Sequence, residues 1–374
     1  MDFIGGFASY LLPFLIVLTV LVFVHELGHY WVARRNGVRV EIFSIGFGPE
    51  IFGFNDRAGT RWKFSVIPLG GYVKMFGDAG VASTPGGELP TMTADERAES
   101  FHHKRVGQRA AIVAAGPAAN FIFSILLLAA LFMTSGHPFP AAVVGSVVPG
   151  SPAEQAGFQP GDEVVSVAGR PADRFAELSG LIQAAGPGPI EIDIEREGEE
   201  STLSVTPEFV TVEGADGQPV EILRVGIGAE SGPFGILRSV GMGVSETFTL
   251  SAMTLSAVGE MITGERSTEE LGGPLRIAQM SGDVAQVGII ALLWFMAILS
   301  INLGLINLFP VPMLDGGHLL FYAVEAIRGR PLGERAQEYG FRVGLALVLT
   351  LMIFATWNDL VQLKVVAYVK NLIS

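Results

Sequence analysis

Two histidines and a glutamate lie within five residues, in the segment His25-Glu26-Leu27-Gly28-His29, inside an apolar run that favours a helix. Residues at i and i+4 share one helix face, about 6 Å apart along the axis, so both imidazoles can reach one Zn²⁺ at about 2.0–2.1 Å. The Glu26 carboxylate lies beside them, where it can move a proton from a metal-bound water to a leaving amine. A five-residue pattern arises by chance, and a lone histidine is often only a packed core residue. Ionisable groups inside a membrane are costly, however, and three of them share one turn here. The motif predicts a metal site with His25 and His29 as ligands and Glu26 as catalytic base.

A catalytic zinc needs a third protein ligand and one open position. The chain has no cysteine, which excludes thiolate ligands and disulfides and leaves His, Asp, Glu or backbone groups. Asp315 follows two prolines that interrupt an apolar helix, and non-helical backbone at membrane depth persists only around a protein-lined or wet cavity. Asp315 could instead be a turn residue before Gly-Gly, and His318 is a rival ligand that we expect to cap or pack nearby. We predict one zinc per chain, bound by His25, His29 and Asp315.

The composition indicates a polytopic membrane protein. Hydrophobic residues make up 49% of the chain, charged residues 16%, and the mean hydropathy is +0.46. A fifth apolar stretch, Phe234–Ile262, is interrupted by Arg238, Glu246 and Glu260 and predicts an interfacial amphipathic helix. Four stretches are long and apolar enough to span a bilayer: Phe7–Val32, Ala110–Thr134, Val287–Phe309 and Phe341–Val361.

The distribution of charge predicts the orientation of these spans. Three basic clusters face the cytoplasm if the N-terminus is outside and four spans alternate. They are Arg34, Arg35 and Arg39; Lys104, Arg105 and Arg109; and Arg328, Arg330, Arg335 and Arg342. A fifth span would move Asp315 to the face opposite His25, so four spans satisfy both the charge rule and the chemistry. We expect a bacterial inner-membrane protein with both termini in the periplasm.

The segment Ala141–Glu230 contains sixteen acidic and four basic residues, which predicts one acidic, soluble, periplasmic domain. This charge excludes a nucleic-acid binder. Short β-rich runs separated by one or two helices predict a small open β-barrel with two helices.

Earlier in the chain, apolar and polar residues alternate between Val40 and Gly77, which predicts β-hairpins. The expected order is 1–39 first span, 40–77 β region in contact with the membrane, 78–108 cytoplasmic loop, 109–135 second span, 141–229 inserted domain, 230–286 amphipathic helices, 287–327 third span and Leu-Asp-Gly motif, 328–340 cytoplasmic loop, and 341–374 fourth span and tail.

Several motifs together resemble the site-two protease family (M50-type), most closely the bacterial regulator-of-sigma-E type. The matching segments are His25–His29, Pro68–Met75, Ala115–Phe121, Asn302–Asn307 and Pro310–His318, in family order over nearly the whole chain. The resemblance implies zinc ligands at His25, His29 and Asp315, a base at Glu26, and a membrane-reentrant sheet that holds the substrate as an added strand. It implies substrate-binding residues at Asn302, Asn307, Pro310, Pro312, Gly70, Gly71 and Tyr72. Asn302 and Asn307 could instead form helix–helix hydrogen bonds.

The inserted domain resembles a circularly permuted PDZ domain. The similarity lies in the segments Pro149–Gly157, Pro160-Gly161-Asp162 and Val225-Gly226-Ile227, the last resembling a carboxylate-binding strand. Well-known relatives carry two tandem PDZ domains, whereas this chain has room for one. The predicted groove at Val225, Gly226 and Ile227 either binds a peptide C-terminus or acts as a steric gate.

These observations predict a four-helix membrane protein with a membrane-associated β-hairpin region and an inserted PDZ-like α+β domain. The expected function is zinc-dependent intramembrane cleavage of single-span substrates, such as anti-sigma factors or signal-peptide remnants, within the lipid bilayer. One alternative is a PDZ-bearing scaffold without turnover. Another is an ion transporter, but no inverted repeat is visible and a transporter does not need a glutamate beside a zinc-binding histidine.

Overall fold

The structure, a computed structural model, describes residues 2–77, 92–137, 142–172, 174–213, 219–230, 232–267 and 272–362. Parts of the predicted 78–108 loop and of the C-terminal tail therefore lie outside the described residues. The chain divides into two compact units, each described by itself below. Unit 1 comprises Met1–Ala129 and Val240–Ser374, and unit 2 comprises Ala130–Ser239.

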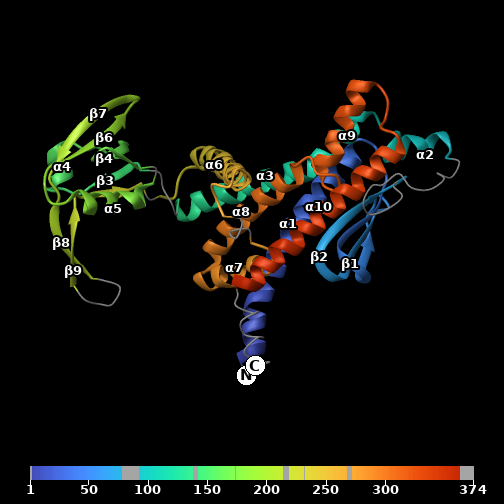
Figure 1. Cartoon of the computed structure of the whole chain (residues 1–374), viewed down its shortest axis with the longest axis horizontal. Coiled ribbons are helices and arrows are strands. Elements are labelled where there is room, and N and C mark those ends of the chain that lie inside the picture. Colours follow the sequence, from blue (N-terminus) through green and yellow to red (C-terminus); the bar gives the residue numbers. More distant parts are fainter. Residues whose placement is uncertain are drawn as a thin grey trace. The chain divides into compact units, whose positions relative to one another are not determined.

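Four helices of the described chain are long and apolar enough to cross a membrane, which confirms that part of the prediction. They are α1 (Asp2–Arg35), α3 (Val106–Ser135), α8 (Ile289–Leu308) and α10 (Glu334–Gln362) (Figure 1). The shorter helices are α2 (Ala94–Glu99), the 3₁₀ turn Phe101–His103, α7 (Pro274–Val287) and α9 (Asp315–Arg328), and the predicted interfacial segment forms α6 (Ile236–Thr263).

The third apolar stretch is divided differently from the prediction. Gly288, at φ +138°, separates α7 from α8, so the apolar helix begins at Ile289 rather than at Val287. The fourth helix begins earlier than expected, at Glu334, because the helical backbone continues through charged residues that precede the apolar run.

The segment between α1 and α2 forms two long antiparallel strands, β1 (Val40–Asn55) and β2 (Arg61–Met75). The first part of β1 pairs on both sides: Phe43 lies opposite Trp62 and also opposite Val73. The strands therefore fold back into a sheet with the segment order 50–55, 61–67, 40–47 and 71–75, in which 71–75 is an edge. Several apolar side chains of this sheet are exposed, among them Ile51, Phe52, Val66 and Leu69.

The β1–β2 sheet is tied to α1 by a carboxylate at its turn. Asp56 accepts a hydrogen bond of 2.7 Å from the Tyr30 hydroxyl and one of 3.1 Å from Trp62 Nε1. It also accepts from the backbone N–H groups of Ala58 and Thr60. Burial alone would raise the pKa of Asp56, but these four donors hold that pKa below its ordinary value.

Unit 2 has its own hydrophobic core, which includes Val144, Val164, Ile192 and Leu178. Its strands are β3 (Val144–Val147), β4 (Glu163–Val167), β5 (Arg170–Pro171), β6 (Ile190–Arg196), β7 (Glu199–Val205), β8 (Glu208–Glu213), β9 (Pro219–Arg224) and β10 (Ile227–Ala229), and its helices are α4 (Pro152–Ala156) and α5 (Phe175–Ala185).

The strands of unit 2 do not form one open barrel in the described residues. They pair as a four-stranded sheet in the order β5-β4-β6-β7 and as two separate ribbons, β10-β3 and β8-β9. A single bridge, Val143 to Glu163, links the start of β3 to β4. The β8–β9 ribbon is an element that the predicted strands do not include.

Candidate metal centre

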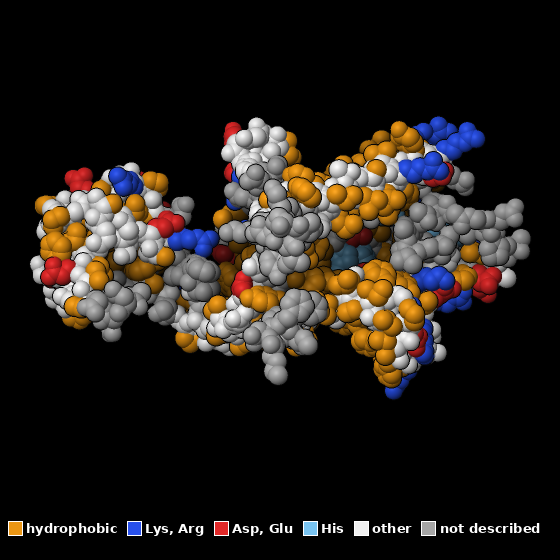
Figure 2. Space-filling model, turned by 60° about the horizontal axis from the view of Figure 1, so that its bottom comes forward, with side chains coloured by type: hydrophobic (Ala, Val, Ile, Leu, Met, Phe, Trp, Pro, Cys, Tyr) orange, Lys and Arg blue, Asp and Glu red, His pale blue; other side chains and the backbone are white. Residues whose placement is uncertain are grey.

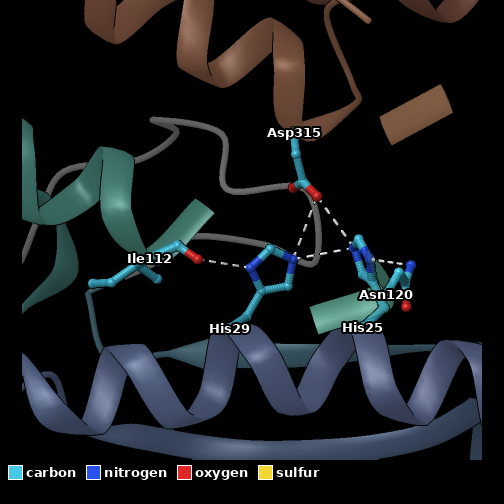
Figure 3. A network of polar contacts seen from close by, with 5 residues as sticks. All are labelled: His25, His29, Ile112, Asn120 and Asp315. Carbon is cyan, nitrogen blue, oxygen red and sulfur yellow. Dashed lines mark hydrogen bonds and ion pairs between the residues drawn. The ribbon is translucent and has the colours of Figure 1, made fainter. Parts of the chain in front are cut away.

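Two imidazoles of α1 project from one helix face toward the same point (Figure 3). The Nε2 atoms of His25 and His29 lie 3.2 Å apart, and each residue is only 9% exposed. The i, i+4 spacing puts both rings on the face of α1 that meets α3. Gly28 lies between them, where any side chain would overlap the Ala115 carbonyl of α3. Glycine at this position therefore permits the close approach of the two helices.

Asp315, the first residue of α9, points at the two histidines from the opposite side (Figure 3). Its Oδ2 lies 3.1 Å from His25 Nε2 and 3.5 Å from His29 Nε2. Gly316 and Gly317 follow it, and a Cβ at either would overlap backbone carbonyls of Leu308, Phe309 or Val311. The start of α9 is thus packed directly against the end of α8. This packing sets the position of Asp315, which lies beside the histidines although 286 positions separate it from His29 in sequence.

The donor set fits zinc. The ligand atoms of His25, His29 and Asp315 all lie within 4.8 Å of one another. Asp315 Oδ2 is buried and faces the two imidazole Nε2 atoms with no regular hydrogen bond among the described residues, an arrangement that a shared cation satisfies. Two imidazole nitrogens and one carboxylate oxygen form a three-ligand set of the kind found in catalytic zinc sites.

The cluster keeps limited access to the surface. The side chains of His25 and His29 are 11% exposed and that of Asp315 is 16% exposed. Figure 2 shows histidine and acidic side chains at the floor of a hollow between hydrophobic side chains. A fourth position on a metal would therefore remain reachable, as a catalytic site requires.

Helix α3 lines the histidines with three residues spaced by four: Ile112, Gly116 and Asn120. His29 Nδ1 donates to the Ile112 carbonyl at 2.9 Å, and Asn120 Nδ2 lies 3.2 Å from His25 Nδ1. A Cβ at Gly116 would overlap the imidazole of His29. The segment Ala115–Phe121 carries the family resemblance, and its role at the histidines emerges only from the structure. The signal was present as Gly116 and Asn120 on one face of an apolar helix.

Glu26 faces the edge segment of the β1–β2 sheet. Its carboxylate accepts a hydrogen bond from the backbone N–H of Val73. A Cβ at Gly71 would lie 2.9 Å from Val22 Cγ1 and 3.3 Å from Glu26 Cγ, so glycine lets β2 pass directly over this turn of α1. The edge 71–75 therefore borders the proposed base.

The remaining predicted substrate residues lie in several different environments. Asn302 Oδ1 accepts a 3.0 Å hydrogen bond from Thr254 of α6, so Asn302 forms the helix–helix hydrogen bond that was the alternative to substrate binding. Asn307 lies near the end of α8, and Pro310 and Pro312 lie in the connection to α9. Pro312 packs against α10 near Gly340.

Within the β region, Gly70 has φ +133° and approaches the Phe47 ring, on which Tyr72 stacks with a centroid distance of 6.2 Å. His318 lies outside the donor cluster and packs against Phe341, with ring centroids 5.3 Å apart.

The three residues predicted for the PDZ groove lie together in unit 2. Val225 is 2% exposed and its carbonyl accepts from the Ala153 N–H, so its side chain belongs to the core. Gly226 has φ +91° and its carbonyl accepts from Val148, while Ile227 pairs with Val147.

Comparison with known proteins agrees with this chemistry. The model of peptidase family M50 matches residues 13–351. A Rhizobium meliloti protein named as a zinc metalloprotease is 47% identical over 361 residues, covering 94% of this chain and 96% of its own length. A similarly named protein of Agrobacterium fabrum is 46% identical, covering 96% and 97%. Metalloprotease MmpA of Caulobacter vibrioides is 36% identical, covering 98% and 99%. The chain belongs to peptidase family M50 and is a zinc metalloprotease of the membrane.

Proposed function

We propose that this chain is an intramembrane zinc endopeptidase that cleaves the transmembrane segments of single-span substrates. The observation that carries the proposal is the convergence of His25, His29 and Asp315 on one point, with Glu26 beside them on an apolar helix long enough to span a bilayer. Ionisable groups in such a helix are costly, and a cluster of them indicates function.

In this proposal the three clustered side chains are the ligands. A zinc ion bound there would act as a Lewis acid on the scissile carbonyl and make an attacking water more acidic. Glu26 takes the proton of that water on its carboxylate and passes it to the leaving amine. The Val73 N–H, which donates to Glu26, orients the carboxylate for this transfer.

The edge 71–75 is the proposed binding site for substrate backbone. Within the described residues, this segment pairs with 40–45 on one side and has no second strand partner. A substrate segment added to it would be extended, as peptide-bond hydrolysis requires, and its carbonyls would pass next to Glu26. Gly70, Gly71 and Tyr72 belong to or adjoin this edge, and Asn302, Asn307, Pro310 and Pro312 are proposed as further substrate contacts. The Thr254 hydroxyl already donates to Asn302 Oδ1, which leaves the Nδ2 group of Asn302 as a donor for substrate carbonyls.

The arrangement of charge supports a cytoplasmic opening of the site. Ten residues separate His25 from Arg35 at the end of α1, which places the histidine roughly 15 Å from that end of the helix. The basic end of α1 lies near α2, where Arg39 pairs with Glu99. Arg109 of α3 pairs with Glu325 of α9 at the same end of unit 1 (Figure 1). We place this end in the cytoplasm and unit 2 in the periplasm of a bacterial inner membrane.

The exposed apolar side chains of the β1–β2 sheet support its contact with lipid. Ile51 is 71% exposed and Phe52 61% exposed, which is costly in water and favourable in a bilayer. Unit 2 is proposed as a PDZ-like domain that binds a peptide C-terminus or screens substrates by size. The Val225 side chain is buried, and the carbonyls of Val225 and Gly226 already accept hydrogen bonds from Ala153 and Val148.

Replacing Glu26 with Gln tests the proposed reaction. The variant should retain zinc, because Glu26 is not one of the three ligands, and should lose at least about 100-fold in turnover of a membrane substrate. The measurement is mapping of cleavage products in native membranes, where wild type should cut inside the span of the substrate.

The Glu338→Gln variant is the matched control, because Glu338 is an exposed carboxylate that pairs with Arg342 on the surface of α10. Normal cleavage by Glu26→Gln, or wild-type products cut only outside the span, would contradict the proposal.

A further inference from the structure

Asn120 is a fully buried polar side chain that no step of the proposed reaction uses. It lies on α3 with 0% exposure, and its amide contacts His25 Nδ1 at 3.2 Å (Figure 3). Its Oδ1 is buried and has no hydrogen-bond partner among the described residues. An unsatisfied amide oxygen in an apolar interior destabilises the fold, so its retention calls for an explanation.

The neighbouring His29 shows which tautomer a histidine ligand needs at this site. His29 Nδ1 lies 2.9 Å from the Ile112 carbonyl, which can only accept, so the proton is on Nδ1 and the Nε2 lone pair faces Asp315. For His25 Nε2 to present a lone pair to the same metal, its own Nδ1 must carry a proton and needs an acceptor.

The amide of Asn120 can provide that acceptor without any change in backbone. A half-turn about the Cβ–Cγ bond exchanges Nδ2 and Oδ1, which places the oxygen at 3.2 Å from His25 Nδ1. The exchange satisfies the orphaned oxygen and sets the His25 tautomer in one step. The two histidines are then held alike, one by a backbone carbonyl and one by a side-chain carbonyl, both on α3.

Two hydroxyl groups contact the backbone of Asn120 and not its side chain. Its backbone carbonyl accepts from Ser124 Oγ at 2.9 Å and from Ser300 Oγ of α8 at 3.0 Å. These bonds hold the backbone of α3 against α8 and do not touch the metal site.

We propose that Asn120 is a positioning residue, whose Oδ1 accepts the Nδ1–H of His25 and thereby aims His25 Nε2 at the zinc. The inference rests on the proposed role of His25 as a zinc ligand. Partners of this kind typically contribute 10–100-fold to metal affinity or activity.

Zinc affinity of the purified full-length protein, measured by competition with a chelator, tests this inference. The isosteric variant Asn120→Leu should bind zinc about 10–100-fold more weakly, whereas Asn120→Asp, which keeps an acceptor oxygen, should stay within a few-fold of wild type. The Ser300→Ala variant is the matched control: it loses a contact to the same residue and should keep wild-type affinity. Visible absorption of the Co²⁺-substituted proteins should change for Asn120→Leu and not for Ser300→Ala.

Three outcomes overturn the inference. Asn120→Leu could retain wild-type zinc affinity and Co²⁺ spectrum; Asn120→Asp could be as weak as Asn120→Leu; or Ser300→Ala could be as weak as either. Should Asn120→Leu not fold, Asn120→Ala, which any helix accommodates, replaces it with the same expectation. Failure of the underlying metal site has a different signature, because His25→Ala would then leave zinc binding unchanged.

Discussion

At the scale of single residues, the metal site depends on two glycines of α1 and α3 as well as on its ligands. Gly116 and Gly28 leave room where α1 and α3 meet, and no side chain larger than hydrogen fits at either. Metal-binding geometries tolerate displacements of only about 0.5 Å. The two histidines therefore keep their positions because α3 lies against them without a Cβ in between.

The Gly116→Ala variant should weaken zinc binding at least about tenfold. The added methyl would overlap the His29 imidazole and displace it, and overpacking of this kind typically costs 1–3 kcal/mol. Helix propensity works in the opposite direction, since alanine favours a helix by up to about 1 kcal/mol over glycine. Chelator competition and the helical circular dichroism signal together separate loss of metal from loss of fold.

Gly107→Ala is the control on the same helix, because a Cβ there has nothing within 4 Å. Equal zinc affinity in the two variants would show that α3 does not confine the histidines.

At the scale of elements, the site joins segments that are far apart in sequence. Helix α1 carries two ligands, α9 carries the third, α3 lines both histidines, and β2 passes over Glu26. The hydrogen bond from Tyr30 to Asp56 links the turn of the β1–β2 sheet to α1. Since Tyr30 directly follows His29, this link sets the position of the sheet edge relative to the metal site.

The Asp56→Ala variant should loosen the sheet without removing zinc. The carboxylate accepts from four donors, and hydrogen bonds to a charged group contribute about 1.5–3 kcal/mol each. Backbone amides of β1 and β2 should therefore exchange hydrogen at least about tenfold faster. The Arg57→Ala variant, which changes the neighbouring turn residue, should exchange like wild type.

Acid should act in the same direction as Asp56→Ala. The pKa of Asp56 is held below its ordinary value of 3.8, so the folded state binds fewer protons than the unfolded state at this group. Its contribution is complete above about pH 4 and is lost as the pH falls through the lowered pKa. Unchanged sheet protection in Asp56→Ala, or a loss that begins near neutral pH in wild type, would contradict this account.

At the scale of the whole molecule, charge separates the two units. The acidic stretch 141–230 lies within unit 2, whereas basic residues cluster at one end of unit 1 (Figure 2). Under the positive-inside rule this asymmetry opposes placing both on one side of a membrane.

Single-cysteine labelling can test the proposed orientation, because the natural chain contains no cysteine. Glu200 of unit 2 and Arg330 after α9 are both exposed. In cells with a permeabilised outer membrane, an impermeant maleimide should label the Glu200→Cys variant at once. The Arg330→Cys variant should be labelled only after the inner membrane is opened. Labelling of both, or the reverse order, would reject the four-span topology.

Much of this protein can be predicted from sequence because some signals are local and periodic. Long apolar runs predicted four spans, since a bilayer demands a certain length of apolar helix. The spacing of His25 and His29 predicted a shared face, since the helical period makes i and i+4 neighbours. Charge and the family motifs predicted that Asp315 would meet them, and the structure brings these three residues together.

Other features depend on contacts between distant segments, and only the tertiary structure decides them. The roles of Ile112 and Asn120 follow from the crossing of α1 and α3, which no local pattern specifies. Strand β1 pairs with β2 residues on both of its sides, which places the edge 71–75 over Glu26. Asn302 forms a hydrogen bond with Thr254 of α6. The sequence by itself determined which residue types could bind a metal and which helices could cross a membrane. How α3 and β2 surround that metal site was decided by packing, because close approach depends on three-dimensional fit and not on periodicity.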